Sequence, residues 1–328
     1  MGLEDAGFES VLAVEIEQDA AATYSRIFPQ SDLRQEDIWE VLRGRGLTAL
    51  RGRIELVAGG APCQPFSSGG KRLAQCDPRD GLPAFFKAVS QVKPPAFLLE
   101  NVPGLLAGDR AAYLKGFITE MVELGYDVTW KVLNAADFGV PQRRLRLLVV
   151  GSQIGPFTWP HPTHGPTADR PYETVSKYLI RTSTLGDPNP SVVVYAKNPD
   201  LRPSPYDGHL FNGGGRPINM NGLCHTILAS AGGNKTHFID TMDEVPRYHA
   251  HLKRGGSPRT GIFAGGRRLT VAESAIIQTF PSGVSFDGSR SSQYTQVGNA
   301  VPPRLAAVIG RALADLLSGA SYSETMIG

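Results

Sequence analysis

The sequence predicts an α/β protein in which a doubly wound, mostly parallel sheet is joined to a second, smaller and irregular domain. Apolar, strand-like runs alternate with helix-like segments as far as Gly151, which is typical of a parallel sheet with helices on both faces. Residues 152–222 are instead rich in Pro, Gly, Asn, Asp and Ser, a composition typical of loops. The length of 328 residues is sufficient for two domains and a sizeable core.

Each predicted strand is a short apolar run, and glycines or prolines bound two of them. In chain order, the predicted strands are residues 10–16, 54–60, 96–102, 126–133, 143–151 and 191–196.

The clearest predicted helix covers residues 111–125, where apolar residues recur every three or four positions and Gly125 is placed to end the helix. In the segment 82–92, Pro83 falls in the first turn, where a helix tolerates proline. The remaining predicted helices are residues 18–28, 270–280 and 302–319.

The composition argues against several classes of protein. No apolar run approaches the roughly 20 residues of a membrane span, and the acidic N-terminus lacks a signal-peptide core, so we expect a cytoplasmic protein with no membrane partner. Three widely spaced cysteines (Cys63, Cys76 and Cys224) fit neither a disulfide framework nor a zinc site, and we predict no metal. The net charge of +2 permits a nucleic-acid partner, because a local basic face can lie within a balanced total.

Reactive side chains follow three of the predicted strands. Glu15 lies at the end of the first apolar run, Cys63 in the loop after the second, and Glu100 at the end of the third. Ligands of doubly wound sheets bind beyond the carboxyl ends of the strands, so we expect these residues to face one crevice. A thiolate and a carboxyl group there suit covalent catalysis on an electron-poor ring, with Cys63 as nucleophile and Glu100 as proton donor to a ring nitrogen.

A further group of polar residues occupies the stretch 141–150. Gln142, Arg144 and Arg146 fall at alternate positions, so we expect them to share one face of a strand. Two arginines beside Cys63 would hold the thiolate charged and could clamp phosphate oxygens. For an isolated pair of arginines, the alternative is an ordinary solvated edge of the sheet.

Five motifs occur along the chain in one order. They are "APCQPFS" (61–67), "ENVPGLL" (100–106), "GVPQRRLRLLVVG" (139–151), "RRLTVAESAIIQTFP" (267–281) and "QVGNAVPP" (296–303). Together they resemble the cytosine-C5 DNA methyltransferase family of bacterial type, over roughly residues 1–151 and 266–319. Each motif alone is modest, but five in the family's order with compatible gaps form a specific signal.

The resemblance implies the class I S-adenosylmethionine-dependent methyltransferase fold and a division into three parts. Residues 1–155 would form the catalytic and cofactor domain, and residues 156–265 the target-recognition domain. Residues 266–328 would form a hinge and a C-terminal segment that returns to the catalytic domain.

The resemblance also implies a mechanism. Cys63 would attack C6 of a cytosine flipped out of duplex DNA, and Glu100 would protonate N3. Arg144 and Arg146 would position the nucleotide and the catalytic loop, and C5 would receive a methyl group from S-adenosylmethionine. Such an enzyme belongs to a restriction-modification system or acts as an orphan modification enzyme, and a cognate restriction endonuclease is an expected partner.

Binding residues are implied position by position. The residues expected to bind S-adenosylmethionine are Glu15, Ile16, Asp37, Ile38, Pro62, Asn299 and Ala300. The residues expected to bind DNA are Gln64, Ser67, Lys71, Arg72, Lys253, Arg254 and Arg259. A plain helix start is the alternative for Asp37 and Ile38, and a solvated loop is the alternative for the basic stretch 249–268.

One family motif is missing from the sequence. The family opens with a strand and a Phe-x-Gly-x-Gly turn, whereas this sequence begins at what matches the following helix. A start placed too far downstream, a complementing chain that supplies the strand, and a decayed enzyme are three explanations. The alternatives to a DNA methyltransferase are therefore an inactive or partial DNA-binding subunit and a tRNA cytosine-C5 methyltransferase of the same fold.

Overall fold

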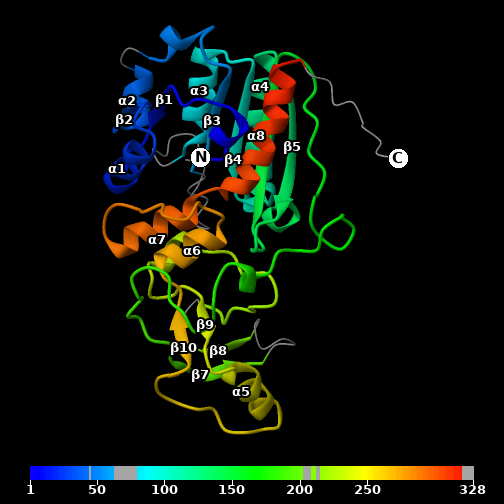
Figure 1. Ribbon diagram of the computed structural model, residues 1–328. Helices are drawn as coiled ribbons and strands as arrows, with labels where there is room; N and C mark the ends of the chain where they lie inside the picture. The colour runs from blue at the N-terminus through cyan, green and yellow to red at the C-terminus, as the bar shows by residue number, and fades with distance from the viewer. Residues whose placement is uncertain (44–45, 63–79, 202–207, 212–214, 320–328) are drawn as a thin grey trace. The chain divides into compact units, whose positions relative to one another are not determined.

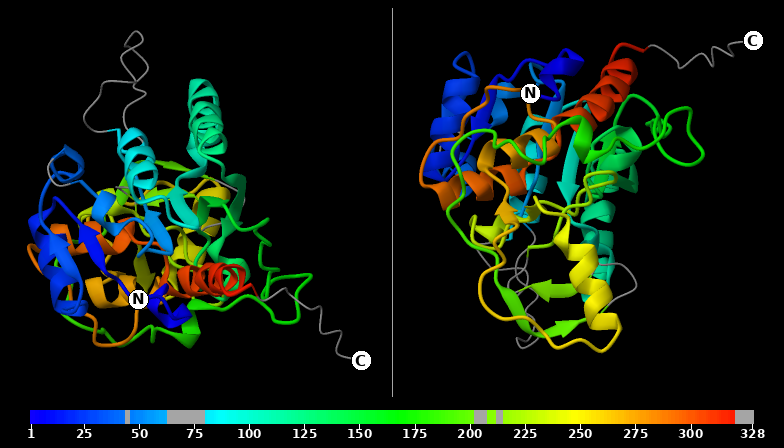
Figure 2. Two further views of the ribbon diagram at one scale, coloured as in Figure 1. Left: turned by 90° about the horizontal axis from the view of Figure 1, so that it is seen from above. Right: turned by 60° about the horizontal axis from the view of Figure 1, so that its bottom comes forward.

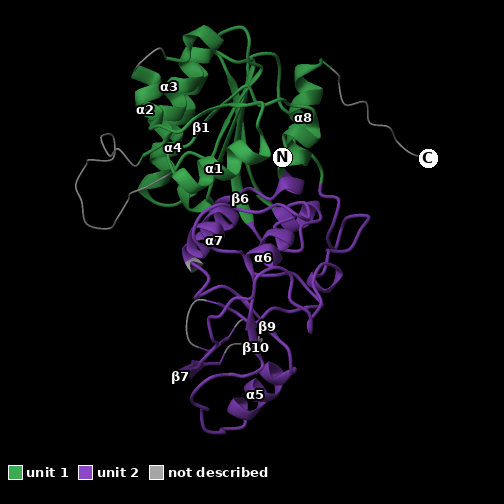
Figure 3. Cartoon of the chain, turned by 60° about the vertical axis from the view of Figure 1, so that its left-hand side comes forward, with its two compact units in different colours: residues 1–134, 145–161, 306–328 green, residues 135–144, 162–305 purple. Residues whose placement is uncertain are grey.

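The computed structural model of the chain describes residues 1–43, 46–62, 80–201, 208–211 and 215–319 (Figure 1). The chain divides into two compact units, which Figure 3 shows in different colours. Unit 1 comprises Met1–Asn134, Leu145–His161 and Ala306–Gly328, and unit 2 comprises Ala135–Arg144 and Pro162–Leu305.

Strands and helices alternate through unit 1, as the sequence predicts. Its strands are β1 Leu12–Val14, β2 Asp32–Arg34, β3 Leu56–Gly59, β4 Ala96–Asn101, β5 Asp127–Asn134 and β6 Leu145–Ser152. Its helices are α1 Gln18–Ile27, α2 Ile38–Arg43, α3 Leu82–Val92, α4 Asp109–Glu123 and most of α8 Pro303–Leu317.

The main sheet of unit 1 has the strand order β3-β4-β6-β5. Strands β3 and β4 are parallel, and β6 is antiparallel to both of its neighbours, so β3, β4 and β5 share one direction. The α/β class is confirmed, but this sheet is mixed, because β6 is antiparallel to both of its neighbours. The connection 135–144 between β5 and β6 contains only a short 3-10 helix, whereas a parallel return needs a crossover of a dozen or more residues.

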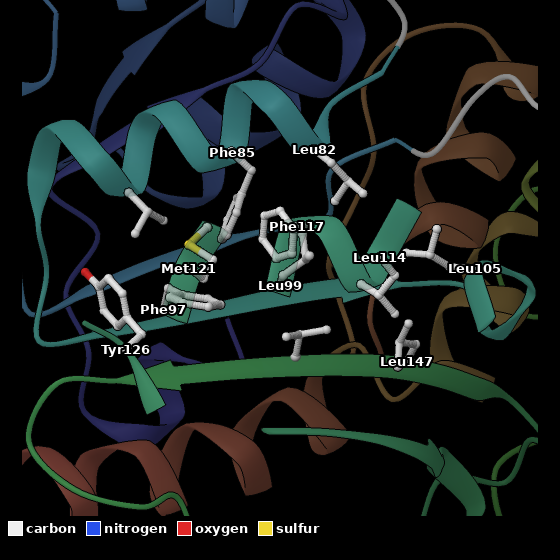
Figure 4. Close-up of a cluster of buried hydrophobic side chains, with 12 residues drawn as sticks. Leu82, Phe85, Phe97, Leu99, Leu105, Leu114, Phe117, Met121, Tyr126 and Leu147 are labelled. Carbon is white, nitrogen blue, oxygen red and sulfur yellow. The ribbon is translucent and has the colours of Figure 1, made fainter. Parts of the chain in front are cut away.

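Helices cover both faces of this sheet. On one face, α3 and α4 pack their apolar sides against β4 and β6 (Figure 4). Phe97 lies at the centre of that core, in edge contact with the rings of Phe85, Phe117 and Tyr126. Helix α8 lies on the opposite face, which the left view of Figure 2 shows from above. This arrangement is the doubly wound α/β fold that the sequence predicts.

Strands β1 and β2 form a separate parallel pair in unit 1. Leu12 and Val14 of β1 and Val57 of β3 all pack against a small cluster built by α2 and α3. Among the described residues, β1 pairs only with β2, and β3 pairs only with β4.

Unit 2 has short strands and long irregular segments. Its strands are β7 Tyr195–Asp200, β8 His209–Phe211, β9 Phe238–Asp240 and β10 Gly266–Arg268. Its helices are α5 Glu244–Lys253, α6 Val271–Ile277 and α7 Arg290–Asn299. The two strand pairs β7–β8 and β9–β10 are antiparallel. The strand predicted at 191–196 instead runs from Tyr195 to Asp200, because the register is set by pairing with β8.

Two hydrophobic clusters stabilise unit 2, one around α6 and α7 and one around α5 and the short strands. Residues 135–144 and 266–305 group with this unit, whereas α8 groups mostly with unit 1. The functional ranges 1–155, 156–265 and 266–328 remain predictions.

A neutral histidine is buried in unit 2. The Nδ1 atom of His237 accepts a hydrogen bond from the backbone N–H of Arg216, and its Nε2–H donates to the carbonyl of Thr226, both at 3.0 Å. Burial lowers the pKa of His237 from 6.5 to about 4. The folded chain therefore resists protonating this ring over a pH range in which the unfolded chain takes up the proton.

We expect His237 to make the chain less stable in mild acid. Between pH 6.5 and about pH 4 the unfolded state binds more protons at His237, so stability falls as the pH drops, by about 2 kcal/mol from pH 7 to pH 5. Urea unfolding of the wild type and of His237→Gln at both pH values measures the difference. The Gln variant should lack this part of the loss, and an equal loss in both proteins would contradict the prediction.

Candidate active site

An ion pair links the ends of two neighbouring strands in unit 1. Glu100 is the fifth residue of β4 and lies opposite Leu148 of β6, so Arg146 is its diagonal neighbour on the same face of the sheet. Nε of Arg146 lies 2.7 Å from Oε1 of Glu100, and the two side chains are 11% and 15% exposed. The structure thus brings Glu100 and Arg146 together, and their shared role in a catalytic site stays a prediction.

The ion pair lies in a partly dehydrated environment. Burial lowers the pKa of Arg146 below its usual value, and the charge and hydrogen bond of Glu100 oppose that change. A second guanidinium nitrogen, Nη1, donates to the carbonyl of Leu145 at 2.8 Å. Arg146 is therefore fixed in one orientation, and it holds the Glu100 carboxyl group in place.

The backbone after β3 passes close to Glu100. Gly59 pairs with Leu99 in the parallel register of β3 and β4, which places Gly60 beside Glu100. A Cβ atom at position 60 would lie only 3.2 Å from Oε2 of Glu100. Glycine at this position therefore allows the base of the following loop to approach the carboxylate closely.

Two sets of hydrogen bonds anchor the residues on either side of the segment 63–79. Nδ2 of the buried Asn101 donates to the carbonyl of Ala61 at 2.9 Å, which fixes the first side next to β4. The backbone N–H of Gly81 donates to the carbonyl of Pro62 at 2.8 Å, so the two sides meet. Both approach the end of β4 that carries Glu100.

Asp80 anchors the residues that follow the segment 63–79. Its Oδ1 accepts a hydrogen bond from the N–H of Leu82 at the start of α3, at 3.1 Å. Its Oδ2 accepts a hydrogen bond from the hydroxyl of Tyr113 on α4. Asp80 therefore connects the end of the segment to two helices of the core.

Several predicted site residues lie outside the described residues. They are Cys63, Gln64, Ser67, Lys71 and Arg72. Their roles stay predictions. Of the residues predicted around them, Pro62 and Glu100 are described, and the structure places both at the same edge of the sheet.

The residues predicted to bind the cofactor in the first part of the chain follow β1 and β2. These strands are parallel, with Val14 opposite Arg34, so Glu15 and Ile16 leave from the same edge as the chain that leads to Asp37 and Ile38. Oε1 of Glu15 accepts the N–H of Glu17 at 2.9 Å, and Ile16 is 59% exposed.

Asp37 has a local structural contact as well. Its Oδ1 accepts the N–H of Trp39 at 2.8 Å, which satisfies a free donor in the first turn of α2. Ile38 packs against the cluster of α2 and α3. Asp37 and Ile38 therefore do form a helix start, as the alternative expects. Their role in binding the cofactor remains a prediction.

The expectation that Gln142, Arg144 and Arg146 share one strand face is wrong. Strand β6 begins at Leu145, and the residues before it pair with a segment of unit 2 through the bridge between Gln142 and Cys224. Gln142 and Arg144 are fully buried among residues of unit 2, whereas Arg146 bonds within unit 1. Strict alternation applies only inside a regular strand, and here the strand starts too late.

The basic residues predicted to bind DNA differ in their surroundings. Lys253 and Arg254 are exposed at the end of α5. Arg259 donates to Oε1 of Glu244 at 2.6 Å, and its guanidinium carbon lies 5.2 Å from the centre of the Tyr248 ring. Part of the charge of Arg259 is therefore already compensated within the unit.

Charge is divided unequally between the two units. Unit 2 contains 17 Lys and Arg residues against 11 Asp and Glu residues, a net charge of +6. Unit 1 contains 16 against 20, a net charge of −4. The small total of +2 thus conceals a strongly basic unit.

Sequence reasoning places Asn101 at this edge beside Glu100, but it misses Asp80 and Tyr113, which also position the site. The hydrogen bond of Asn101 to Ala61 joins residues 40 positions apart, and that of Tyr113 to Asp80 joins residues 33 positions apart. A local sequence pattern does not predict partners at such separations. The sequence does give a signal for Asn101, because this residue directly follows Glu100 in the "ENV" triplet.

The family model described as C-5 cytosine-specific DNA methylase matches residues 1–189 and 217–315. The chain belongs to the C-5 cytosine-specific DNA methylase family. This confirms the family that the five motifs predict. It also confirms the predicted class, a DNA cytosine-5-methyltransferase that uses S-adenosylmethionine.

Curated relatives extend over nearly the whole chain. The type II methyltransferase M1.HphI of Haemophilus parahaemolyticus is 34% identical over 325 residues, which are 95% of this chain and 82% of the relative. The type II methyltransferase M.NgoMIV of Neisseria gonorrhoeae is 32% identical over 328 residues, covering 95% and 92% of the two chains.

Solved structures agree on the fold. A DNMT2 mutant of Spodoptera frugiperda has a TM-score of 0.69 at 16% identity and covers 95% of this chain and 96% of its own. A putative prophage DNA modification methyltransferase of E. coli has a TM-score of 0.63 at 21% identity, with coverages of 97% and 95%. At these identities the likeness concerns the methylase fold, and it confirms the predicted fold class.

Within the described residues of this methylase, no group of three or more His, Cys, Asp and Glu side chains could hold a metal ion. In the same ranges, no helix combines the length and apolar character needed to cross a membrane.

We expect Glu100 and Arg146 to be strongly coupled in stability. Arg146→Ala leaves a largely buried carboxylate without its ion-pair partner, which should cost about 3 kcal/mol. Glu100→Gln in the same background should recover part of this loss, giving a coupling energy of roughly 1–3 kcal/mol in a double-mutant cycle. Urea unfolding of the four proteins measures it, and additive effects of the two substitutions would contradict the expected coupling.

Proposed function

We propose that this chain transfers a methyl group from S-adenosylmethionine to C5 of a cytosine flipped out of duplex DNA. The observation that carries the proposal is the Glu100–Arg146 ion pair beside Gly60, three residues before Cys63. A carboxyl group positioned next to the loop of a cysteine nucleophile supports covalent catalysis on a pyrimidine.

In the first step, the Cys63 thiolate attacks C6 of cytosine. A sulfur–carbon bond forms, the C5–C6 double bond opens, and electron density moves to C5 while N3 receives a proton from Glu100. Arg146 keeps the Glu100 carboxyl group oriented through the 2.7 Å contact. The pair lies in a partly dehydrated site, where such electrostatic contacts are stronger than in water.

S-adenosylmethionine would supply the methyl group that C5 accepts, and its sulfur–methyl bond would break to leave the neutral thioether S-adenosylhomocysteine. Water then takes the C5 proton, the electron pair restores the C5–C6 double bond, and the sulfur–C6 bond breaks to release the Cys63 thiolate. The proton on N3 returns to Glu100, so the residues of the chain end in the state in which they began.

The residues after β1 fit the cofactor chemically. Glu15 offers a carboxylate at a strand end for ribose hydroxyls, and Ile16 beside it exposes 59% of its surface for contact with a flat ring. The residues that we propose for this role are Glu15, Ile16, Asp37, Ile38, Pro62, Asn299 and Ala300.

We assign contact with the DNA phosphates to exposed basic residues. The net charge of +6 of unit 2, with Lys253 and Arg254 exposed on it, supports target recognition within residues 156–265. Gln64, Ser67, Lys71 and Arg72 are proposed to contact DNA around the flipped base. A cytoplasmic location and a cognate restriction endonuclease follow from a role in restriction-modification.

A complementing chain is a second proposal, and the strand pairing favours it. The apolar residues of β1 are only half-buried, and Ala58 of β3 is exposed, whereas five of the six residues of β4 are buried. Among the described residues, one edge of β1 and one edge of β3 lack a strand partner. Calorimetric titration of the purified chain with S-adenosylmethionine tests this, and tight binding by the chain alone would remove the need for a second chain.

A comparison of two substrates, duplex DNA and tRNA, tests the alternative that the chain is a tRNA cytosine-C5 methyltransferase. Methyl incorporation from S-adenosylmethionine into duplex DNA should exceed incorporation into tRNA, and the reverse preference would sink the DNA assignment.

We expect Cys63→Ala to abolish methyl transfer, because the substitution removes the proposed nucleophile. Duplex DNA containing 5-fluorocytosine should trap the wild-type chain covalently, since fluorine cannot leave C5 as a proton. Gel electrophoresis of the adduct measures this. Cys76→Ala is the matched control and should still form the adduct, whereas an adduct with Cys63→Ala would show that another residue is the nucleophile.

We expect Lys253→Ala/Arg254→Ala to weaken DNA binding in a salt-dependent manner. Each lost phosphate contact should lower the slope of log affinity against log salt concentration by about 1. Fluorescence anisotropy at several salt concentrations measures the slope. Lys131→Ala removes one exposed charge from unit 1 and should leave the slope unchanged. An unchanged slope in the double variant would exclude these residues as phosphate contacts.

A further inference from the structure

Arg144 is a fully buried arginine whose guanidinium binds backbone carbonyls from two separate segments of unit 2. Nη1 donates to the carbonyl of Ile227 at 3.0 Å. Nη2 donates to the carbonyl of Gly298 at 2.6 Å and to that of Ala300 at 2.9 Å. One side chain therefore ties the segment before β6 to the end of α7.

The carbonyls at the end of α7 need such donors. The last four carbonyls of an α-helix lack intrahelical partners, and they carry the negative end of the helix dipole. Nε2 of Gln278 donates to the carbonyl of Val297 at 2.5 Å, and Arg144 supplies the donors for the next two bonds. The charge of the buried guanidinium is thus placed where the helix dipole stabilises it.

Close packing fixes the same helix end from another side. A Cβ atom at position 298 would lie 2.3 Å from the backbone nitrogen of Ala229, so only glycine permits this approach. Oγ1 of Thr295 on α7 donates to the carbonyl of Ala229 at 3.2 Å. Little freedom remains for the turn that follows α7.

The two carbonyls that Nη2 of Arg144 binds flank Asn299, whose side chain is exposed. We propose that Arg144 is a positioning residue that fixes Asn299 for contact with S-adenosylmethionine, in place of the role beside the nucleotide and the catalytic loop that the family resemblance implies. This inference rests on the proposed function, because the cofactor role of Asn299 is part of it.

The geometry requires arginine in particular. The planar guanidinium directs several N–H groups in a fixed fork, and three carbonyls use them here. A lysine keeps the charge but presents one ammonium group on a flexible chain, so it cannot hold the carbonyls of residues 298 and 300 in the same geometry.

Arg144→Lys in the full chain tests the inference. Calorimetric titration with S-adenosylmethionine should show binding about tenfold weaker, the factor that corresponds to one well-placed hydrogen bond. The KM for S-adenosylmethionine should rise while kcat at saturating cofactor changes little, which separates positioning from catalysis. Asn299→Ala should weaken binding in the wild type but add little in the Arg144→Lys background, because both substitutions remove the same contact.

Arg268→Lys is the matched control. Arg268 is buried in the same unit, and its guanidinium also binds carbonyls, at Thr236 and Val192, away from α7. This variant should bind S-adenosylmethionine as the wild type does, and hydrogen exchange at residues 297–301 should rise only in Arg144→Lys.

The outcomes distinguish failure of the positioning role of Arg144 from failure of the proposed function. Wild-type affinity in Arg144→Lys, or equal losses in both lysine variants, would overturn the positioning role alone. Additive losses from Arg144→Lys and Asn299→Ala would do the same. Absence of S-adenosylmethionine binding by the wild-type chain would instead overturn the proposed function of this chain on its own, on which the role of Arg144 depends, and would favour the complementing chain.

Discussion

The contact between Arg146 and Glu100 is the constraint on which the rest of the site depends. Two charges, each close to nine-tenths buried, remain in unit 1 because they compensate one another at 2.7 Å. That contact requires β6 to run antiparallel beside β4, since only then does Arg146 become the diagonal neighbour of Glu100. The direction of one strand therefore decides whether the sheet can present a fixed carboxylate.

Backbone contacts complete the site around this ion pair. Gly60 passes within close range of the carboxylate, Asn101 anchors Ala61, and the carbonyl of Pro62 meets the N–H of Gly81. None of these contacts depends on a reactive side chain. They fix the residues on either side of the segment 63–79, which contains Cys63, the nucleophile that we propose.

The basic residues of the chain are concentrated in unit 2, the unit that we propose to contact DNA. The methylase family acts on a polyanion, and the basic surplus of this chain lies in unit 2, while unit 1 is acidic. The same separation explains why the total net charge is a poor guide to the partner.

The sequence by itself determined the elements with strong local signals. Helix α3 lies at residues 82–92 as predicted, and α4 differs from its prediction by two residues at each end, because apolar spacing and turn residues act within a few positions. The motif order determined the family, and the ends of β3 and β4 brought Pro62 and Glu100 to one edge. Helices α5 and α7 were not predicted, since few apolar residues mark them and packing within unit 2 stabilises them.

Only the tertiary structure decided where buried polar groups find their partners. Arg144 and Arg146 are two positions apart, yet one binds carbonyls up to 156 positions away in unit 2, and the other binds a carboxylate in unit 1. A buried donor must be satisfied by whatever acceptor the folded chain brings to it, and that choice is made by long-range packing. Local sequence patterns identify residues with reactive or charged side chains. The tertiary structure determines which of these side chains can reach a ligand and which instead bind and position other residues.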